Sequence, residues 1–285
     1  MKKIIFTIFI SLFFLTGCMK FNSMEDIDIY TSIYPIEYFA NRLYGDHSTV
    51  HSIYPDGIIY KVYTLNDKQL KDYSKSDLFI FNGLGSEKDY LKTMLKDNPN
   101  LKIIDATTSM EYLNYEEELW IDPSNALMIA RNIKSGLSEY INNHYLKNQI
   151  EKNYESLKVD LSNLSAKLYL ISENSSDSTI VVSSNAFKFL EKYGFTVISL
   201  EENINNGKII NYIKSRIASG QTKNIFVLKD EELDDDIQNI INEFNINKLE
   251  FHTLSNISES ERSSKKDYVS ICLENINLLK QELYK

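Results

Sequence analysis

The sequence predicts an α/β protein with two Rossmann-like lobes, each built on a parallel sheet, which are joined by a long α-helix and enclose a ligand cleft. Short apolar segments alternate with amphipathic helical segments in residues 27–124 and again in residues 173–285, whereas residues 125–172 show only helical patterns. Such alternation is typical of parallel sheets covered by helices. Ligands bind open sheets beyond the carboxyl ends of the strands, so we expect the cleft there.

The first 17 residues have the layout of a lipoprotein signal peptide. Lys2 and Lys3 precede an apolar run of about 12 residues, which is too short to span a hydrocarbon core that needs roughly 20. The run ends in Leu15-Thr16-Gly17-Cys18, which has the form of a lipobox. We therefore expect cleavage before Cys18, lipid on its thiol, a tether over residues 18–26, and anchoring at the extracytoplasmic face of the cell membrane. A plain signal peptide with a chance cysteine is the weaker alternative.

Alternating patterns predict the elements of the N-terminal lobe, residues 27–124. Residues 27–33 alternate apolar and polar side chains, as a half-buried strand does, and residues 78–81 are wholly apolar, as a buried parallel strand is. Further strands are expected at residues 50–54 and 103–104, and helices at residues 35–43, 67–73 and 90–95.

The middle of the chain, residues 125–172, predicts helices that link the two lobes. Leu157, Leu161, Leu164 and Leu168 recur at steps of four and three, which places them on one helical face. A helix over residues 146–170 would be roughly 37 Å long at 1.5 Å per residue. We interpret its apolar stripe as core packing, because the pattern is too short for a free coiled coil.

The C-terminal lobe, residues 173–285, repeats the alternation. Gly194 is expected to end one helix, and the acidic run of residues 230–236 is expected to begin another, where carboxylates favour the positive end of the helix dipole. We expect a mobile loop at the polar residues 258–266. Strands are expected at residues 179–182, 197–200, 225–228 and 249–252, and helices at residues 186–193, 209–218, 237–244 and 268–284.

Charge and the lack of catalytic motifs argue against several classes of function. The net charge of −9 disfavours nucleic acid as a partner, because phosphate contacts need clustered Lys and Arg. The chain has two cysteines, and if Cys18 carries lipid, Cys272 is expected to be a buried, inert thiol. The sequence contains no nucleophile elbow, phosphate loop or Cys-His arrangement, so we do not expect an enzyme.

Five stretches of the chain carry a family resemblance. They are Thr31-Ser32-Ile33-Tyr34-Pro35, Pro55-Asp56-Gly57, residues 76–85, Leu119-Trp120-Ile121-Asp122-Pro123 and residues 181–187. In order and spacing the chain resembles the zinc/manganese solute-binding lipoproteins of ABC importers. The resemblance implies two similar lobes, a rigid helix between them, a divalent metal (zinc or manganese) as the transported ligand, and an ABC permease in the same membrane as partner. We expect a monomer with no resident cofactor.

The resemblance also points to four ligand-binding positions in the cleft, and this sequence departs from the family at each of them. Where the family has three histidines, this chain has Lys61, Glu118 and Ser184, and the family's carboxylate aligns with His252. Glu118 and His252 could still bind a metal through oxygen and nitrogen. A lysine ammonium has no lone pair and repels a dication, so these two ligands beside Lys61 would make a poor high-affinity site.

Other interpretations of the four residues stay open. Lys61 and Glu118 could form an ion pair, or together bind the carboxylate and amine of an amino-acid-like solute. Ser184 is either a neutral filler or a hydrogen-bond donor to such a solute, and His252 is either a ligand or an ordinary strand-end histidine. The sequence favours a solute-binding lipoprotein of an importer; the alternative is a surface lipoprotein or adhesin that kept the fold and lost metal binding.

Overall fold

The computed structural model describes residues 24–111 and 118–284. The predicted signal peptide, Cys18 and most of the predicted tether therefore lie outside the described residues. Within the described residues, no helix has both the length and the apolar character needed to cross a membrane.

The N-terminal lobe is a four-stranded parallel sheet in the order β2-β1-β3-β4. Its strands are β1 (Ile27–Thr31), β2 (Ser48–Ser52), β3 (Leu78–Phe81) and β4 (Lys102–Asp105). All four side chains of β3 are buried, as the wholly apolar run predicts for a central strand. The helices of this lobe are α2 (Tyr34–Tyr44), α3 (Asp67–Tyr73) and α4 (Lys88–Asp97), with the 3-10 helix η1 (Gly45–His47) after α2.

The C-terminal lobe repeats this topology, with the strand order β6-β5-β7-β8 and parallel pairing throughout. Its strands are β5 (Thr179–Val182), β6 (Thr196–Ser199), β7 (Asn224–Leu228) and β8 (Asn247–Phe251). The remaining elements are η3 (Asn185–Tyr193), α7 (Leu200–Asn203), α8 (Gly207–Ala218), α9 (Asp235–Phe244), α10 (Glu259–Ser263) and α11 (Tyr268–Leu283). Two lobes of matching strand order confirm the predicted α/β fold.

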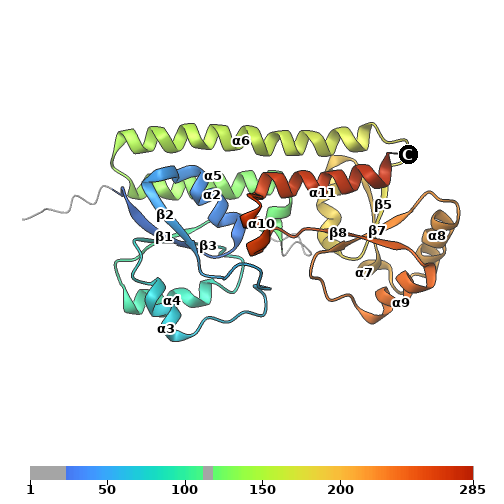
Figure 1. The fold of residues 1–285 in the computed structure, drawn as a ribbon, viewed down its shortest axis with the longest axis horizontal. Coiled ribbons are helices and arrows are strands. Elements are labelled where there is room, and N and C mark those ends of the chain that lie inside the picture. The colour runs from blue at the N-terminus through green and yellow to red at the C-terminus, as the bar shows by residue number, and fades with distance from the viewer. Residues whose placement is uncertain (1–23, 112–117, 285) are drawn as a thin grey trace, which may run out of the picture.

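Two long helices join the lobes. After the 3-10 turn η2 (Leu119–Ile121), α5 (Pro123–Tyr140) leads into α6 (His144–Glu173), whose 30 residues run along both lobes (Figure 1). The leucines of the predicted stripe are buried on α6. They belong to one apolar core that extends from Ile29 of β1 to Leu279 of α11, so the two lobes share a packed spine.

Two expectations for the C-terminal lobe differ from the structure. Residues 185–193 form a 3-10 helix rather than an α-helix, and this helix ends at Gly194, which has a positive φ of 89°. The prediction of a mobile loop at residues 258–266 is wrong, because the helix α10 forms there. A capping box starts α10: the Ser258 side chain accepts from the backbone N–H of Glu261, and the Glu261 side chain accepts from that of Ser258.

Candidate functional site between the lobes

Trp120 brings together the chain segments that carry three of the predicted site residues. Its indole is buried, and Nε1 donates a hydrogen bond of 2.9 Å to the carbonyl oxygen of Thr253, next to His252. On another side its ring meets the ring of Tyr60, next to Lys61, with centroids 6.1 Å apart. Glu118 lies two residues before Trp120. The loop after β2, the turn η2 and the end of β8 therefore converge between the lobes.

Lys61 and Glu118 form the predicted ion pair. Lys61 Nζ lies 3.4 Å from Glu118 Oε1, and the Glu118 side chain is only 7% exposed whereas that of Lys61 is 45% exposed. A buried carboxylate needs a compensating charge, and the lysine supplies it from the solvent side. The ammonium thus occupies one side of the carboxylate that the family resemblance offers as a metal ligand.

His252 points to a different partner. Its Nδ1 accepts a hydrogen bond of 2.9 Å from the Leu254 backbone N–H, and its Nε2 lies 3.3 Å from Glu261 Oε1. Burial lowers the pKa of His252, and nearby Lys229 lowers it further, so the ring is neutral at pH 7. A neutral ring that accepts at Nδ1 carries its proton at Nε2, which leaves neither nitrogen with a free lone pair for a metal.

Glu261 is the residue that engages His252, and sequence reasoning missed it. Burial alone would raise the pKa of Glu261, but hydrogen bonds from Lys229 and Ser258 outweigh burial and lower the pKa to about 2. Glu261 is therefore ionised at any physiological pH. The Ser-x-x-Glu spacing of its capping box was the available sequence signal.

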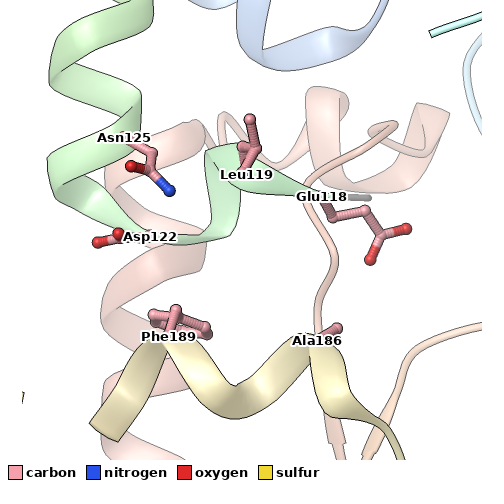
Figure 2. A pocket seen from close by; sticks show the side chains of 6 residues that line it. All are labelled: Glu118, Leu119, Asp122, Asn125, Ala186 and Phe189. Atoms are coloured by element: carbon pink, nitrogen blue, oxygen red, sulfur yellow. The ribbon is translucent and has the colours of Figure 1, made fainter. Parts of the chain in front are cut away.

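Ser184 caps η3 at the carboxyl end of β5. Its hydroxyl accepts a hydrogen bond of 3.2 Å from the Ala186 backbone N–H, which satisfies the start of that helix. Ala186 lines the same small pocket as Glu118, so η3 faces the carboxylate from the other lobe (Figure 2).

This interlobe pocket is small and open to solvent. It has essentially no room for a water-sized sphere, and Figure 2 shows the carboxylates of Glu118 and Asp122 directed away from each other. Sites for drug-sized molecules usually measure about 300–1,000 Å³. The residues that line the pocket are Glu118, Leu119, Asp122, Asn125, Ala186 and Phe189.

Asp122, which also lines the pocket, joins the two lobes, a role that sequence reasoning did not assign. The carboxylate caps α5 by accepting from the Ser124 backbone N–H at 3.0 Å. It also accepts from the Tyr193 hydroxyl at 2.5 Å and is paired with the Lys192 ammonium, both from the C-terminal lobe. An Asp followed by Pro at a helix start is a capping signature, but only the fold brings η3 to it.

The four predicted residues thus lie around one interlobe region, but their side chains divide into separate contacts: Lys61 with Glu118, His252 with Glu261, and Ser184 with the start of η3. Across residues 24–111 and 118–284, no three His, Cys, Asp or Glu side chains are grouped so that they could hold a metal ion. The ligand-binding role of the four residues stays a prediction.

Solved structures share this architecture. The zinc-bound ZnuA-like domain of Streptococcus pneumoniae AdcA superposes with a TM-score of 0.72 at 19% identity, covering 91% of this chain and 100% of that domain. The metal-dependent lipoprotein YcdH of Bacillus subtilis gives a TM-score of 0.74 at 18% identity, with coverage of 91% and 100%. At such identities the likeness shows the fold.

Sequence comparisons show the family. The chain is 25% identical over 241 residues to a metal ABC transporter substrate-binding lipoprotein of Lactococcus lactis, covering 75% of this chain and 76% of that protein. It is 25% identical over 179 residues to a Chlamydia muridarum protein described as metal-binding, covering 61% of this chain and 64% of that protein, which is less than two thirds. The model of the family described as zinc-uptake complex component A, periplasmic, matches residues 29–282. The predicted resemblance is confirmed: the chain belongs to this ZnuA family of metal-binding solute-binding proteins of ABC transporters.

Proposed function

We propose that the protein is the extracytoplasmic solute-binding component of an ABC importer, anchored by lipid on Cys18, and that it delivers a divalent metal ion to its permease. The observation that carries this proposal is the convergence of the segments around Lys61, Glu118 and His252 on Trp120 between the lobes. The names of the similar proteins support metal as the cargo: one is described as metal-binding, one as a metal ABC transporter substrate-binding lipoprotein, and one solved domain as zinc-bound.

The size of the pocket favours an ion over an amino-acid-like solute. The pocket has essentially no room for a water-sized sphere, and therefore none for a molecule with its own carboxylate and amine. Glu118 provides a buried carboxylate oxygen, which is a suitable ligand for zinc or manganese.

Lys61 is expected to weaken the capture of metal by this carboxylate. Its ammonium sits 3.4 Å from Glu118 and must move away before a dication can bind there. Because the Lys61 side chain is 45% exposed, solvent can receive it, so the ammonium lowers the affinity without abolishing binding. We therefore propose that this protein binds its metal ion with low affinity.

Calorimetry with zinc and manganese on the mature chain (residues 18–285, carrying Cys18→Ser) tests this proposal. We expect Lys61→Ala to bind zinc about ten- to hundredfold more tightly than the unsubstituted protein, which corresponds to roughly 1.4–2.8 kcal/mol. Lys75→Ala is the matched control, because Lys75 pairs with Asp72 on α3 and not with Glu118. Absence of heat with both metals for both the parent protein and Lys61→Ala would refute the metal proposal.

The membrane anchor is tested separately. Metabolic labelling with a fatty acid should place lipid on the full chain expressed in a bacterial host, and Cys18→Ala should abolish the label because it removes the attacking thiol. Cys272→Ala is the control: Cys272 is buried in α11, so its removal should leave the label unchanged. A label that persists in Cys18→Ala would show that lipid attaches elsewhere.

A further inference from the structure

After β8 the chain leaves the C-terminal lobe and lies against the N-terminal lobe. We call residues 253–263, which include α10, the strap. The Ser255 carbonyl accepts from the Tyr34 backbone N–H at 3.2 Å, and the Ile257 carbonyl accepts from the Gly57 backbone N–H at 2.9 Å. The Asn256 side chain adds a hydrogen bond of 3.0 Å to the Pro55 carbonyl. Figure 1 shows α10 between the lobes, beside the N-terminal lobe.

Arg262 fastens the strap to the N-terminal lobe through two carboxylates. Its Nη1 and Nη2 donate to Glu37 Oε1 and Oε2 at 2.8 and 3.2 Å. Its Nε and Nη2 donate to Asp56 Oδ2 and Oδ1 at 2.6 and 2.8 Å. Glu37 is buried, with 6% of its surface exposed. One planar guanidinium thus donates to both oxygens of the buried Glu37 carboxylate and to both oxygens of Asp56.

Glu261, the neighbouring residue, fastens the same short helix to the C-terminal lobe. It accepts from Lys229 Nζ at 2.8 Å and lies 3.3 Å from Nε2 of His252. Consecutive residues of α10 thus bind opposite lobes. A movement that separates the lobes must break the Arg262 contacts or the Glu261 contacts, and a break at Arg262 leaves the carboxylate of Glu37 buried without its cation.

We propose that Arg262 is a positioning residue that holds the two lobes together over the interlobe site, whether or not cargo is bound. The energetic reason is the desolvated carboxylate of Glu37, whose ion-pair partner among the described residues is Arg262 on the strap. In this protein the ion pairs at Arg262 supply a link between the lobes that does not pass through a bound metal. This inference goes beyond the proposed function, because it concerns the conformational equilibrium and not the identity of the cargo.

Distance measurement by pulsed electron spin resonance in the presence of a chelator tests the inference without any cargo. Spin labels are attached at Lys92→Cys on α4 and Asn239→Cys on α9, because both residues are exposed. The helices α4 and α9 lie on the side of the two lobes away from α6 (Figure 1). The mature chain with Cys18→Ser is used, and Cys272 stays unlabelled because it is buried. We expect one narrow distance distribution for this chain and a second population at longer distance for Arg262→Gln.

Three further variants separate positioning from folding. Arg42→Gln is the matched control, because Arg42 Nη2 binds Asp160 of α6 at 2.7 Å and does not link the lobes, so its distribution should stay narrow. Arg262→Lys keeps the charge but cannot bind two carboxylates bidentately, so it should restore the short distance only in part. Asp56→Asn weakens the contacts of Arg262 from the side of the N-terminal lobe. It should broaden the distance distribution even if Arg262→Gln folds poorly.

The outcomes are distinct from those of the metal titration. A distribution for folded Arg262→Gln and Asp56→Asn that matches the parent chain would overturn the strap proposal and leave the metal proposal standing. A parent chain that already shows two populations in chelator would overturn it as well. Failure of zinc to bind would leave the distances, and therefore this inference, unaffected.

Discussion

Replacing Asp122 by alanine is expected to lower the free energy of unfolding by about 2–4 kcal/mol. The loss of the α5 cap costs about 1 kcal/mol, and leaving the buried Tyr193 hydroxyl without this acceptor costs about 1–3 kcal/mol. Lys192 adds little, since its side chain is 41% exposed and water can solvate it. Urea unfolding of the mature chain measures the change.

Asp234→Ala is the matched control for Asp122→Ala. Asp234 also caps a helix, α9, by accepting from the Asp236 backbone N–H at 2.9 Å, but it is exposed. Its loss should cost about 1 kcal/mol or less. Equal losses for the two variants would show that the contacts of Asp122 with η3 contribute nothing beyond the helix cap.

Glu87→Gln is expected to make the protein more stable than the parent chain at pH 8, by up to about 3 kcal/mol, with most of this advantage lost by pH 5. The Glu87 side chain lies before α4 and is 1% exposed, and neither of its oxygens has a hydrogen-bond partner in another described residue. Burial raises its pKa to about 7 from an ordinary value of 4.5.

The direction in which stability changes with pH follows from proton linkage. Between pH 4.5 and 7 the folded protein holds a proton on Glu87 that the unfolded chain has released, so stability falls as the pH rises through this window and levels off above it. Glutamine carries no charge at any of these pH values, so the variant lacks the fall in stability with pH that Glu87 causes. Urea unfolding of the parent chain and the variant at pH 5, 6, 7 and 8 measures the difference in their free energies of unfolding.

Glu282→Gln gives the contrasting control. Glu282 is 2% exposed, but its oxygens accept hydrogen bonds from the backbone N–H groups of Lys223 and Asn224 and from the Asn224 side chain. An amide NH₂ cannot replace an accepting oxygen there, so this variant should be less stable than the parent chain. If the difference between Glu87→Gln and the parent chain did not change with pH, the raised pKa of Glu87 would be contradicted.

Most secondary structure could be predicted because its signal is local. The apolar run of residues 78–81 is β3, and the leucine stripe of residues 146–170 lies within α6. One exception, α10, has only five residues, too few to be stable alone. Its capping box was present in the sequence, but the helix also depends on ion pairs of Arg262 and Glu261 with residues far away along the chain.

For the candidate site too, local signals could be predicted from the sequence and contacts between distant residues could not. Family motifs located Lys61, Glu118, Ser184 and His252, and charge alone made the pairing of Lys61 with Glu118 a reasonable hypothesis. They could not reveal that both nitrogens of His252 are engaged, because that depends on where α10 folds back toward β8. Nor could they reveal that Asp122 of the Trp-x-Asp-Pro motif meets η3 from the other lobe.

The sequence by itself therefore determined the two α/β lobes, the linking helices and the family, since periodicity and short motifs are properties of neighbouring residues. The tertiary structure alone decided the partners of the charged groups. Arg262 meets Glu37 across 225 positions of the chain, and Tyr193 meets Asp122 across 71. Such pairings depend on the packing of both lobes against α6, and an interaction set by packing leaves no periodic trace in the sequence.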